Sequence, residues 1–177
     1  MRKIVYYVAT SIDGFISGPN DDVSGFIHHG KAVDKYLSDL TTFDTVIMGR
    51  NTYEYGYKYG LKPGEIAYQN MTHFIFSDTL EFAEQSPNLH IKKLRIEEIQ
   101  QLKQQSGTDI YLCGGGQFAG WLLENEQIDI LKIKLNPLIL GTGVRLFGNS
   151  GKTCKTELLE KEAYDDGLQL ITYKILY

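Results

Sequence analysis

The sequence of 177 residues is 42% hydrophobic, which is enough for one well-buried core, and it is too short for two domains of typical size. Its formal net charge is −4 and it has no run of Lys and Arg, which argues against sequence-independent binding to nucleic acid. The two cysteines, Cys113 and Cys154, have neither CxxC spacing nor histidine companions, so we expect no metal site and a reducing compartment.

The N-terminal segment reaches polar residues too soon for the apolar region of a signal peptide. No stretch approaches the roughly 20 apolar residues that a membrane helix requires. We therefore expect a single cytoplasmic domain over residues 1–177, which binds a small molecule and neither nucleic acid nor a membrane.

Strand and helix patterns alternate in the first part of the chain. Ile4–Ala9 is a continuous apolar run, typical of a strand covered on both faces. The polar segment Gly18–Gly30 has the length of loops that often cover a site. Apolar residues on one helical face predict a short helix over Asp34–Leu40, and Thr45–Gly49 is an apolar strand that leads directly into a second helix start.

The same alternation continues through the middle of the chain. Tyr55–Gln69 is rich in Gly, Tyr and Lys, which predicts an irregular connection. Thr72–Ser77 and Leu89–Ile91 are predicted strands. An amphipathic helix is expected from Leu94 to near Gly107.

The clearest local signal is the stretch Ile110–Phe118, in which an apolar strand ends in three glycines and an amphipathic helix begins. A strand that enters a helix through glycines exposes unpaired N–H groups at the positive end of the helix dipole, which favours a phosphate. The same glycines also suit a tight turn with close packing. They match neither the spaced Gly-x-Gly-x-x-Gly pattern nor a P-loop, so this stretch alone leaves both interpretations open.

The last part of the chain changes to consecutive strands. Ile128–Leu135 alternates between apolar and polar residues, as a strand with one wetter face does. Pro137–Phe147 is apolar but interrupted by glycines, which predicts a folded-over connection. Two further strands, at about Thr153–Glu162 and Leu168–Leu176, are expected to form a hairpin.

This order predicts an α/β fold in three layers, with a mostly parallel central sheet and antiparallel strands at its C-terminal edge. In such sheets ligands bind beyond the carboxyl ends of the strands. The predicted strand ends at Ala9, Gly49–Arg50, Ser77 and Gly114–Gly116 would therefore face one cleft. Their convergence favours a nucleotide site over a simple turn.

The order of motifs resembles the dihydrofolate reductase-like superfamily, and more closely the reductase domain of the riboflavin-biosynthesis enzyme RibD and its small stand-alone bacterial relatives. The similarity spans nearly the whole chain. It is carried by Tyr7-Val-Ala-Thr-Ser-Ile-Asp-Gly-Phe-Ile16, Val46-Ile-Met-Gly-Arg-Asn-Thr-Tyr-Glu54, Phe76-Ser77, Cys113-Gly-Gly-Gly-Gln-Phe118, Ile128-Asp129 and Asn136-Pro-Leu-Ile-Leu-Gly-Thr-Gly-Val-Arg-Leu-Phe147.

The resemblance implies an NADPH-binding reductase. Next to the nicotinamide it places Ala9 and Ile16. The residues implied for the diphosphate and the adenosine 2′-phosphate side are Gly49, Arg50, Asn51 and Thr52, with the hydroxyl of Ser77 near that phosphate. The loop implied under the diphosphate consists of Gly114, Gly115, Gly116, Gln117 and Phe118. Asp78 beside Ser77 is an unfavourable charge near a 2′-phosphate, so the preference for NADPH over NADH stays open.

The substrate follows less directly. In folate reductases a carboxylate on the first helix binds the pteridine, and Asp34 falls close to that position, although an acidic residue in a first turn also suits the helix dipole. No deaminase signature is present, so the chain resembles the reductase half of RibD alone.

We expect hydride transfer to a small heterocyclic substrate, of which the RibD-type 5-amino-6-(5-phosphoribosylamino)uracil is the first candidate. The alternatives are a dihydrofolate- or dihydropterin-type reductase and a nucleotide-binding protein without catalysis. A homodimer is also implied by the resemblance, with Ile128–Leu135 and the segment 137–147 as its candidate surface.

Overall fold

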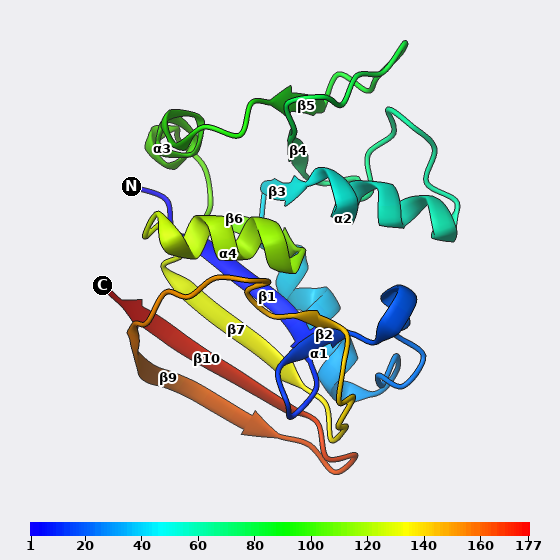
Figure 1. Cartoon of the computed structure of the whole chain (residues 1–177), viewed down its shortest axis with the longest axis vertical. Helices are drawn as coiled ribbons and strands as arrows, with labels where there is room; N and C mark the ends of the chain where they lie inside the picture. The colour runs from blue at the N-terminus through cyan, green and yellow to red at the C-terminus, as the bar shows by residue number, and fades with distance from the viewer.

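An eight-stranded sheet forms the middle of the structure, a computed structural model that describes residues 1–177 (Figure 1). Its strand order is β5-β4-β3-β6-β1-β7-β10-β9. The strands are β1 (Ile4–Thr10), β3 (Thr45–Gly49), β4 (Thr72–Phe76), β5 (Leu89–Lys92), β6 (Ile110–Gly114), β7 (Ile130–Leu135), β9 (Lys155–Ala163) and β10 (Gln169–Leu176).

The strand directions confirm the predicted fold class. Every pairing from β5 across the sheet to β7 is parallel. β10 runs antiparallel to both of its neighbours, β7 and β9. The mostly parallel sheet with an antiparallel C-terminal edge is therefore present as the sequence pattern indicated.

Helices cover both faces of this sheet and make the three expected layers. α3 (Ile96–Gln104) and α4 (Gly116–Glu124) pack on one face, and α1 (Lys31–Leu40) and α2 (Arg50–Tyr55) on the other. In Figure 1, α4 lies in front of the sheet and α1 behind it.

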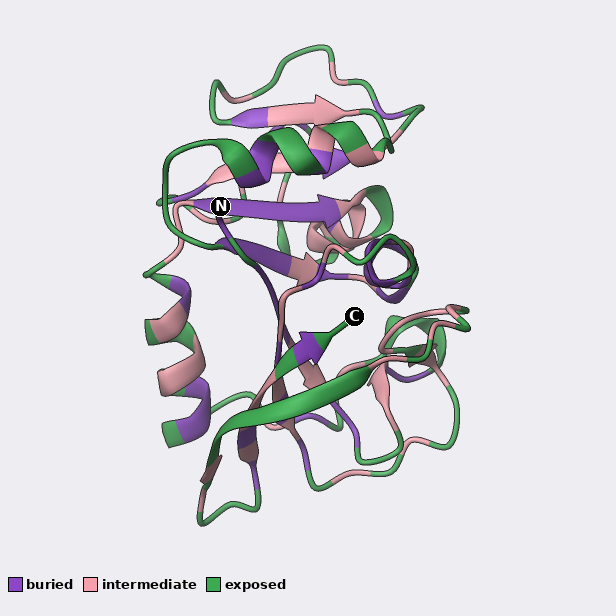
Figure 2. Cartoon of the chain, turned by 90° about the vertical axis from the view of Figure 1, so that its left-hand side faces the viewer, coloured by how far each residue is buried: buried purple, intermediate pink, exposed green.

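The continuous apolar run of β1 follows from this double cover. Successive side chains of a strand point to opposite faces, so Ile4 and Tyr6 join the core under α3 and α4, whereas Val5 and Tyr7 join the core under α1 and α2. All four side chains are buried. The buried strands form the centre of the molecule in Figure 2.

The connections of β3 and β6 determine where a cleft can open. These strands are adjacent in the sheet, yet β3 leads into α2 on one face and β6 leads into α4 on the other. The chain therefore diverges at their carboxyl ends. In α/β sheets such a reversal leaves a crevice in which ligands bind.

A second, two-stranded sheet was not predicted. β2 (Phe15–Ser17) pairs antiparallel with β8 (Val144–Arg145). β8 lies in the segment 137–147, which was expected only to fold over. The close approach depends on Gly143, because a Cβ at this position would lie 2.0 Å from the backbone oxygen of Ser17. This pairing fixes the segment after β1 at the carboxyl end of the large sheet.

The element boundaries differ from the expected ones by a few residues. The first helix starts at Lys31, before the predicted Asp34, and β7 starts at Ile130 because Ile128 and Asp129 precede the pairing with β1. The loop over residues 18–30 contains a short 3₁₀ turn, η1 (Pro19–Asp21), and α2 continues into another, η2 (Gly56–Tyr59).

Polar contacts close the amino end of the sheet. The guanidinium of Arg2 pairs with Asp44 and donates to the hydroxyl of Thr45 at 2.7 Å. Lys103 Nζ lies 2.7 Å from Asp129 Oδ2, which also accepts the backbone N–H of Ile4 at 2.7 Å. Arg2 and Lys103 are buried, so each cation is paired where water cannot solvate it well.

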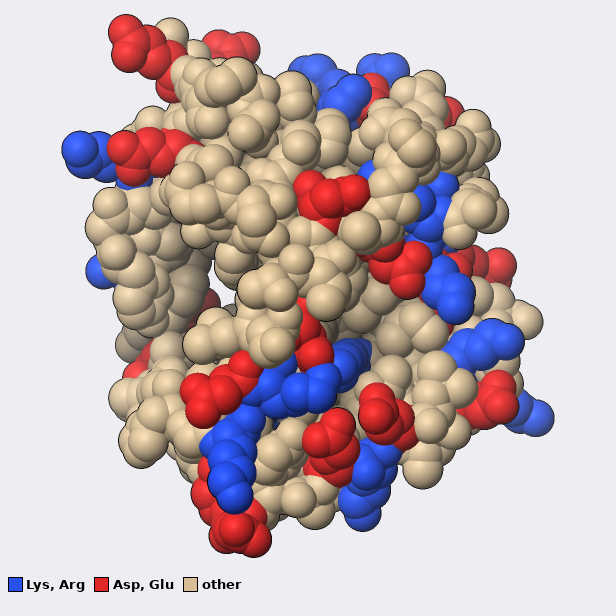
Figure 3. All heavy atoms as spheres, turned by 180° about the vertical axis from the view of Figure 1, so that it is seen from behind, with Lys and Arg blue, Asp and Glu red and all other residues tan.

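The C-terminal edge of the sheet is exposed. β9 is open to solvent along almost its whole length, as Figure 2 shows, and its Leu158 and Leu159 side chains are 55% and 51% exposed. On the face in Figure 3 acidic and basic side chains lie interspersed, and Asp39 on α1 pairs with both Lys35 and Lys132. None of the helices has the length and apolar character that crossing a membrane demands.

His73 anchors the irregular segment before β4. Its Nε2 accepts the backbone N–H groups of Ala67 and Tyr68, both at 3.1 Å, and its Nδ1 lies 3.0 Å from the carbonyl oxygen of Met71, to which it donates. The ring is fully buried, and this burial lowers the pKa of His73 to about 4. The neutral imidazole is therefore the form that holds the segment.

We predict that stability declines as the pH falls from about 6.5 to about 4. Across this window the unfolded chain takes up a proton at His73 and the folded chain does not, so unfolding becomes favoured by up to about 1.4 kcal/mol per pH unit. Urea titrations at several pH values measure this slope. His73→Gln keeps an acceptor but does not titrate, and should reduce the slope; an unchanged slope would contradict the assignment.

Candidate functional site

A cavity of about 620 Å³ opens at the carboxyl ends of the parallel strands. Its volume lies within the range of small-molecule sites. Strand ends, helix starts and the loop after β1 all contribute to its walls. It is lined by Val8, Ala9, Ile16, Ser17, Asp21, Val23, Gly49, Arg50, Asn51, Thr52, Tyr55, Phe76, Leu94, Cys113, Gly114, Gly115, Gly116, Gln117, Phe118, Trp121 and Val144.

The three glycines at the junction of β6 and α4 have different roles. Gly114 has a φ of +130° and open space where a Cβ would be, so its main chain borders the cavity directly. Gly115 is the N-cap of α4. A Cβ on Gly116 would lie 2.2 Å from the backbone oxygen of Arg145, so close packing requires glycine there. The peptide bond between Gly114 and Gly115 is cis.

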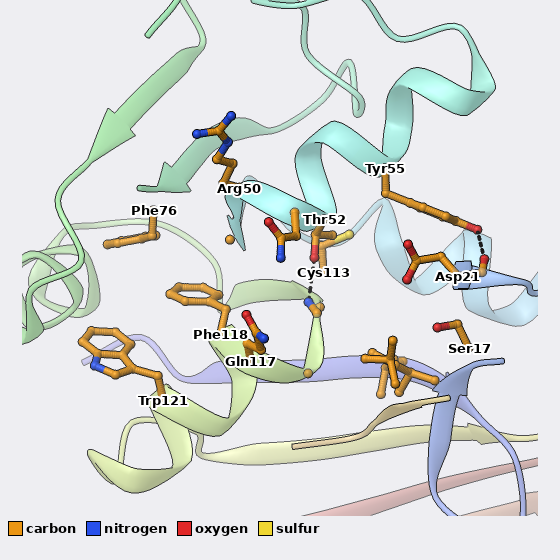
Figure 4. A pocket seen from close by; sticks show the side chains of 18 of the residues that line it. Ser17, Asp21, Arg50, Thr52, Tyr55, Phe76, Cys113, Gln117, Phe118 and Trp121 are labelled. Carbon is orange, nitrogen blue, oxygen red and sulfur yellow. Dashed lines mark hydrogen bonds between the residues drawn. The ribbon is translucent and has the colours of Figure 1, made fainter. Parts of the chain in front are cut away.

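One hydrogen bond joins the starts of α2 and α4. The backbone N–H of Gly115 donates to Thr52 Oγ1 at 2.7 Å (Figure 4). The first turn of a helix leaves its N–H groups without partners inside the helix. The bond therefore holds two sets of such donors beside the same cavity, where both helix dipoles favour an anion.

Arg50 lies at the start of α2 on the cavity wall. Its Nε donates to Glu54 at 2.8 Å and its Nη1 to Thr79 Oγ1 at 3.0 Å. A guanidinium has five N–H donors, so these two bonds orient the group and leave three donors for a ligand. The side chain is 43% exposed, which keeps those donors accessible.

Aromatic rings form one end of the cavity. Phe118 stacks on Phe76 with ring centroids 5.1 Å apart, and on Trp121 at 5.9 Å. Figure 4 shows these rings on one side, with Gln117 pointing into the cavity beside them. Such a surface suits a planar apolar group.

Polar groups form the opposite end. Ser17, Asp21 and Tyr55 lie there in Figure 4, with Thr52 and Cys113 between the two ends. The Tyr55 hydroxyl donates to the backbone oxygen of Asp21 at 3.1 Å and lies 2.9 Å from the Tyr59 hydroxyl. Burial, followed by this contact with Tyr59, raises the pKa of Tyr55, so the hydroxyl keeps its proton.

Cys113 connects the cavity to a buried group of tyrosines. Its Sγ lies 3.4 Å from the hydroxyl of Tyr68, and the hydroxyls of Tyr36 and Tyr111 lie 2.8 Å apart. Burial raises the pKa of the Cys113 thiol. The thiol is therefore protonated at neutral pH and contributes shape and a weak donor, not a nucleophile.

All the predicted cofactor-binding residues except Ser77 line this one cavity. The Ser77 hydroxyl faces its own turn instead, where it accepts the backbone N–H groups of Thr79 at 3.2 Å and Leu80 at 3.0 Å. Asp78 accepts the N–H of Leu94 at 3.4 Å.

Asp34 lies on the exposed side of α1 and is not part of the cavity wall. The helix turns its neighbours Ala32 and Val33 toward the core, which leaves the Asp34 carboxylate in solvent. The structure thus does not bring the sequence-predicted acid to the residues predicted to bind the cofactor.

Sequence reasoning did not identify several residues of the wall. Phe76 and Cys113 could have been found, since Phe76 ends β4, Cys113 is the last residue but one of β6, and the next residue after each was predicted to bind the cofactor. Asp21 lies in a loop and Tyr55 lies at the end of a helix. The hydrophobic periodicity of the sequence therefore does not indicate that these two residues line the same cavity. The chain has no group of three or more His, Cys, Asp or Glu side chains placed to hold a metal ion.

Comparison with known proteins identifies the family. The sequence profile of the RibD C-terminal domain matches residues 2–170. The chain belongs to the RibD C-terminal domain family. The resemblance stated from the sequence motifs is thereby confirmed.

Among curated proteins, YwjB of Bacillus subtilis, which is uncharacterised, is 27% identical over 170 residues and covers 96% of each chain. A putative riboflavin biosynthesis protein from Shewanella has a TM-score of 0.83 at 23% identity, with full coverage of both chains.

Two more distant structures share the fold. A deaminase and 5-amino-6-(5-phosphoribosylamino)uracil reductase from Thermotoga maritima has a TM-score of 0.72 at 15% identity; the match covers 99% of this chain and 57% of that one. Enterococcus faecalis dihydrofolate reductase, complexed with NADP(H), has a TM-score of 0.66 at 14% identity, with 98% and 96% of the two chains covered. The dihydrofolate reductase-like fold is confirmed.

We predict that Thr52→Val destabilises the fold by about 1–2 kcal/mol, because the N–H of Gly115 would lose its acceptor in a partly buried place. Urea unfolding measures the loss. Thr52→Ser keeps the hydroxyl and should retain most of the stability. Equal stabilities of the two variants would show that the bond does not hold the helix starts together.

Proposed function

We propose that this chain is an NADPH-dependent reductase that delivers hydride to a C=N or C=O bond of a small heterocyclic substrate. The observation that carries the proposal is the gathering of two helix starts, an arginine and a glycine-lined wall around one cavity. The cavity can offer several main-chain N–H groups and a guanidinium to the same ligand.

The walls of the cavity suit both the diphosphate and the adenine of a dinucleotide. Unpaired N–H groups at the starts of α2 and α4 suit the diphosphate, and the open side of Gly114 lets a phosphate approach the main chain. The stacked rings of Phe118 and Trp121 suit the adenine. Arg50 can bind a phosphate on the adenosine side through its remaining donors.

The chemistry of the step is divided between cofactor and protein. Bound NADPH supplies the hydride. Ala9 and Ile16 would form the apolar wall beside the nicotinamide, and with Val8 they would exclude water from the reacting carbon. Ser17 and Asp21 remain at the polar end to orient the substrate.

Relatives support a reductase of this kind. The Thermotoga protein is a uracil reductase joined to a deaminase, and the Enterococcus protein is a reductase with NADP(H) bound. We therefore retain RibD-type reduction of 5-amino-6-(5-phosphoribosylamino)uracil as the first candidate, ahead of a dihydrofolate- or dihydropterin-type reduction. Because Asp34 lies outside the cavity, nucleotide binding without catalysis is the competing proposal.

We predict that NADPH raises the thermal unfolding midpoint, since it binds the native state selectively.

Arg50→Ala should weaken NADPH binding about tenfold, as expected for the loss of a charged hydrogen bond. Lys161→Ala removes a cation from β9 and serves as the control. Undiminished NADPH affinity in Arg50→Ala would rule out this placement of the phosphate, and a parallel titration with NADH measures the cofactor preference.

Catalysis is tested separately from binding. Oxidation of NADPH, followed by its absorbance with a panel of aminopyrimidines, uracils and dihydropterins, should reveal turnover with at least one class. Binding of NADPH without turnover across the panel would favour the non-catalytic alternative.

For the quaternary state we propose a homodimer. The exposed Ile139, Leu158 and Leu159 side chains provide apolar area that a partner could cover. Sedimentation equilibrium should give twice the mass of one chain, and Leu158→Glu should shift the equilibrium toward the monomer. A wild-type monomer at micromolar concentration would exclude the proposal.

A further inference from the structure

Reduction of a C=N or C=O bond consumes a proton as well as a hydride, so the cavity needs a proton donor. The carboxylate of Asp34 lies in solvent on α1 and does not line the cavity. Between the aromatic end and the polar end, Figure 4 shows the side chains of Thr52 and Cys113. The thiol of Cys113 is the more acidic of these two groups, and it is therefore the candidate donor.

An irregularity in the sheet sets the position of Cys113. The register of β6 against β3 shifts between Ile47 and Met48, so Cys113 is an extra residue on β6 with no counterpart on β3. A bulge of this kind re-aims a side chain and is common beside active sites. The Cys113 side chain packs against the core under α1 and α2, and it lines the cavity together with Ala9, the residue proposed to lie beside the nicotinamide.

Three tyrosine hydroxyls lie behind the sulfur. The hydroxyl of Tyr68 is 3.4 Å from Cys113 Sγ, and the hydroxyls of Tyr36 and Tyr111 are 2.8 Å apart. The rings of Tyr68 and Tyr111 meet edge to face with their centroids 5.8 Å apart. Tyr111 is buried, and the other two tyrosines pack against the same core. The cluster of Cys113 with these tyrosines thus extends from the cavity wall into the core.

The cluster favours a thiol that can lose its proton for a short time. Burial raises the pKa of the Cys113 thiol, and hydrogen bonds with Tyr68 and Tyr111 act in the opposite direction because they stabilise the thiolate. The sulfur is therefore protonated before a reaction. After it has given up the proton, hydroxyl donors are already in place around the charge, and they need no rearrangement.

Building on the reductase activity proposed above, we propose that Cys113 donates the proton of the reduction and that Tyr68 holds the resulting thiolate. As the carbon of the C=N or C=O bond receives the hydride with its electron pair, the π electrons of that bond move to the nitrogen or oxygen. This atom forms a bond to the thiol proton while the S–H bond breaks. Water returns a proton to Cys113 after the product has left the cavity. Cys113 is then a catalytic residue, and Tyr68 is a positioning residue.

Other proton-bearing groups of the wall are less suited to this step. The hydroxyl of Tyr55 already donates to the backbone oxygen of Asp21 at 3.1 Å, at the polar end. A guanidinium such as that of Arg50 does not lose a proton in proteins. The hydroxyl of Thr52 is engaged by the N–H of Gly115 and holds two helix starts together.

Steady-state kinetics with the compound that turns over fastest test the catalytic role. Cys113→Ala should lower kcat about 100-fold, as the loss of a general acid does, and should leave NADPH affinity nearly unchanged. Cys113→Ser keeps a proton to donate and should recover about tenfold of the lost rate. Cys154→Ala replaces the other cysteine, which does not line the cavity, and should keep the kcat of the wild type.

Tyr68→Phe tests the positioning role, because it keeps the ring and removes the hydroxyl at the sulfur. It should lower kcat about tenfold in the otherwise unchanged chain and cause no further loss in Cys113→Ala, since the tyrosine acts through the thiol. Tyr164→Phe removes a hydroxyl that binds Glu162 on β9 and serves as the control.

Alkylation of Cys113 by iodoacetamide, followed by mass spectrometry, gives a measurement that needs no turnover. The reaction proceeds through the thiolate, so Tyr68→Phe should slow it about tenfold, whereas Tyr164→Phe should not. NADPH should protect Cys113 and leave the alkylation of Cys154 unchanged, because only the first of these sulfurs lies on the cavity wall.

The outcomes separate this inference from the reductase proposal. Turnover by the wild type with an undiminished kcat in Cys113→Ala would overturn the inference and leave the reductase intact. Equal alkylation rates in the wild type and Tyr68→Phe, or additive losses of kcat in the double variant, would refute the role of Tyr68. Absence of turnover with every compound would refute the reductase proposal itself, and the proton donor with it.

Discussion

The site depends on one constraint of the chain path: two neighbouring parallel strands, β3 and β6, send their helices to opposite faces of the sheet. The carboxyl ends of these strands cannot be covered by either helix, so the crevice between them is a result of topology. The hydrogen bond from Gly115 to Thr52 then fixes the distance between the two helix starts. Through this link, the N–H groups at the starts of α2 and α4 lie on the wall of the same cavity.

The three glycines at the junction of β6 and α4 show how packing and proposed binding can share one short motif. The sequence left two interpretations open, a tight turn and a phosphate approach, and different residues satisfy them. Gly116 is enclosed, with the backbone of Arg145 where a side chain would start, and so belongs to the turn. Gly114 faces open space at the cavity wall, and so belongs to the proposed approach of the phosphate.

Most of the sheet and helices could be predicted from the sequence, because strands covered on both faces and amphipathic helices leave regular patterns such as Ile4–Ala9. The pairing of β2 with β8 could not, since strands of three and two residues have no detectable period. In the site, residues at strand ends were predictable by topology. The orientation of Asp34 was not, because a shift of one or two positions along a helix decides whether a side chain faces the core or solvent. Asp21 was missed because a loop conformation places it.

The amino ends and the carboxyl ends of the parallel strands differ in the polar contacts around them. At the amino end, the buried cations Arg2 and Lys103 bind carboxylates on neighbouring segments and close the layers together. At the other end, the loop that contains Asp21 is held by main-chain hydrogen bonds within the loop and by the hydroxyl of Tyr55, without a buried ion pair. Substitutions in residues 18–24 would therefore change the cavity wall, to which Asp21 and Val23 contribute, and would leave the paired cations at the far end of the same strands in place.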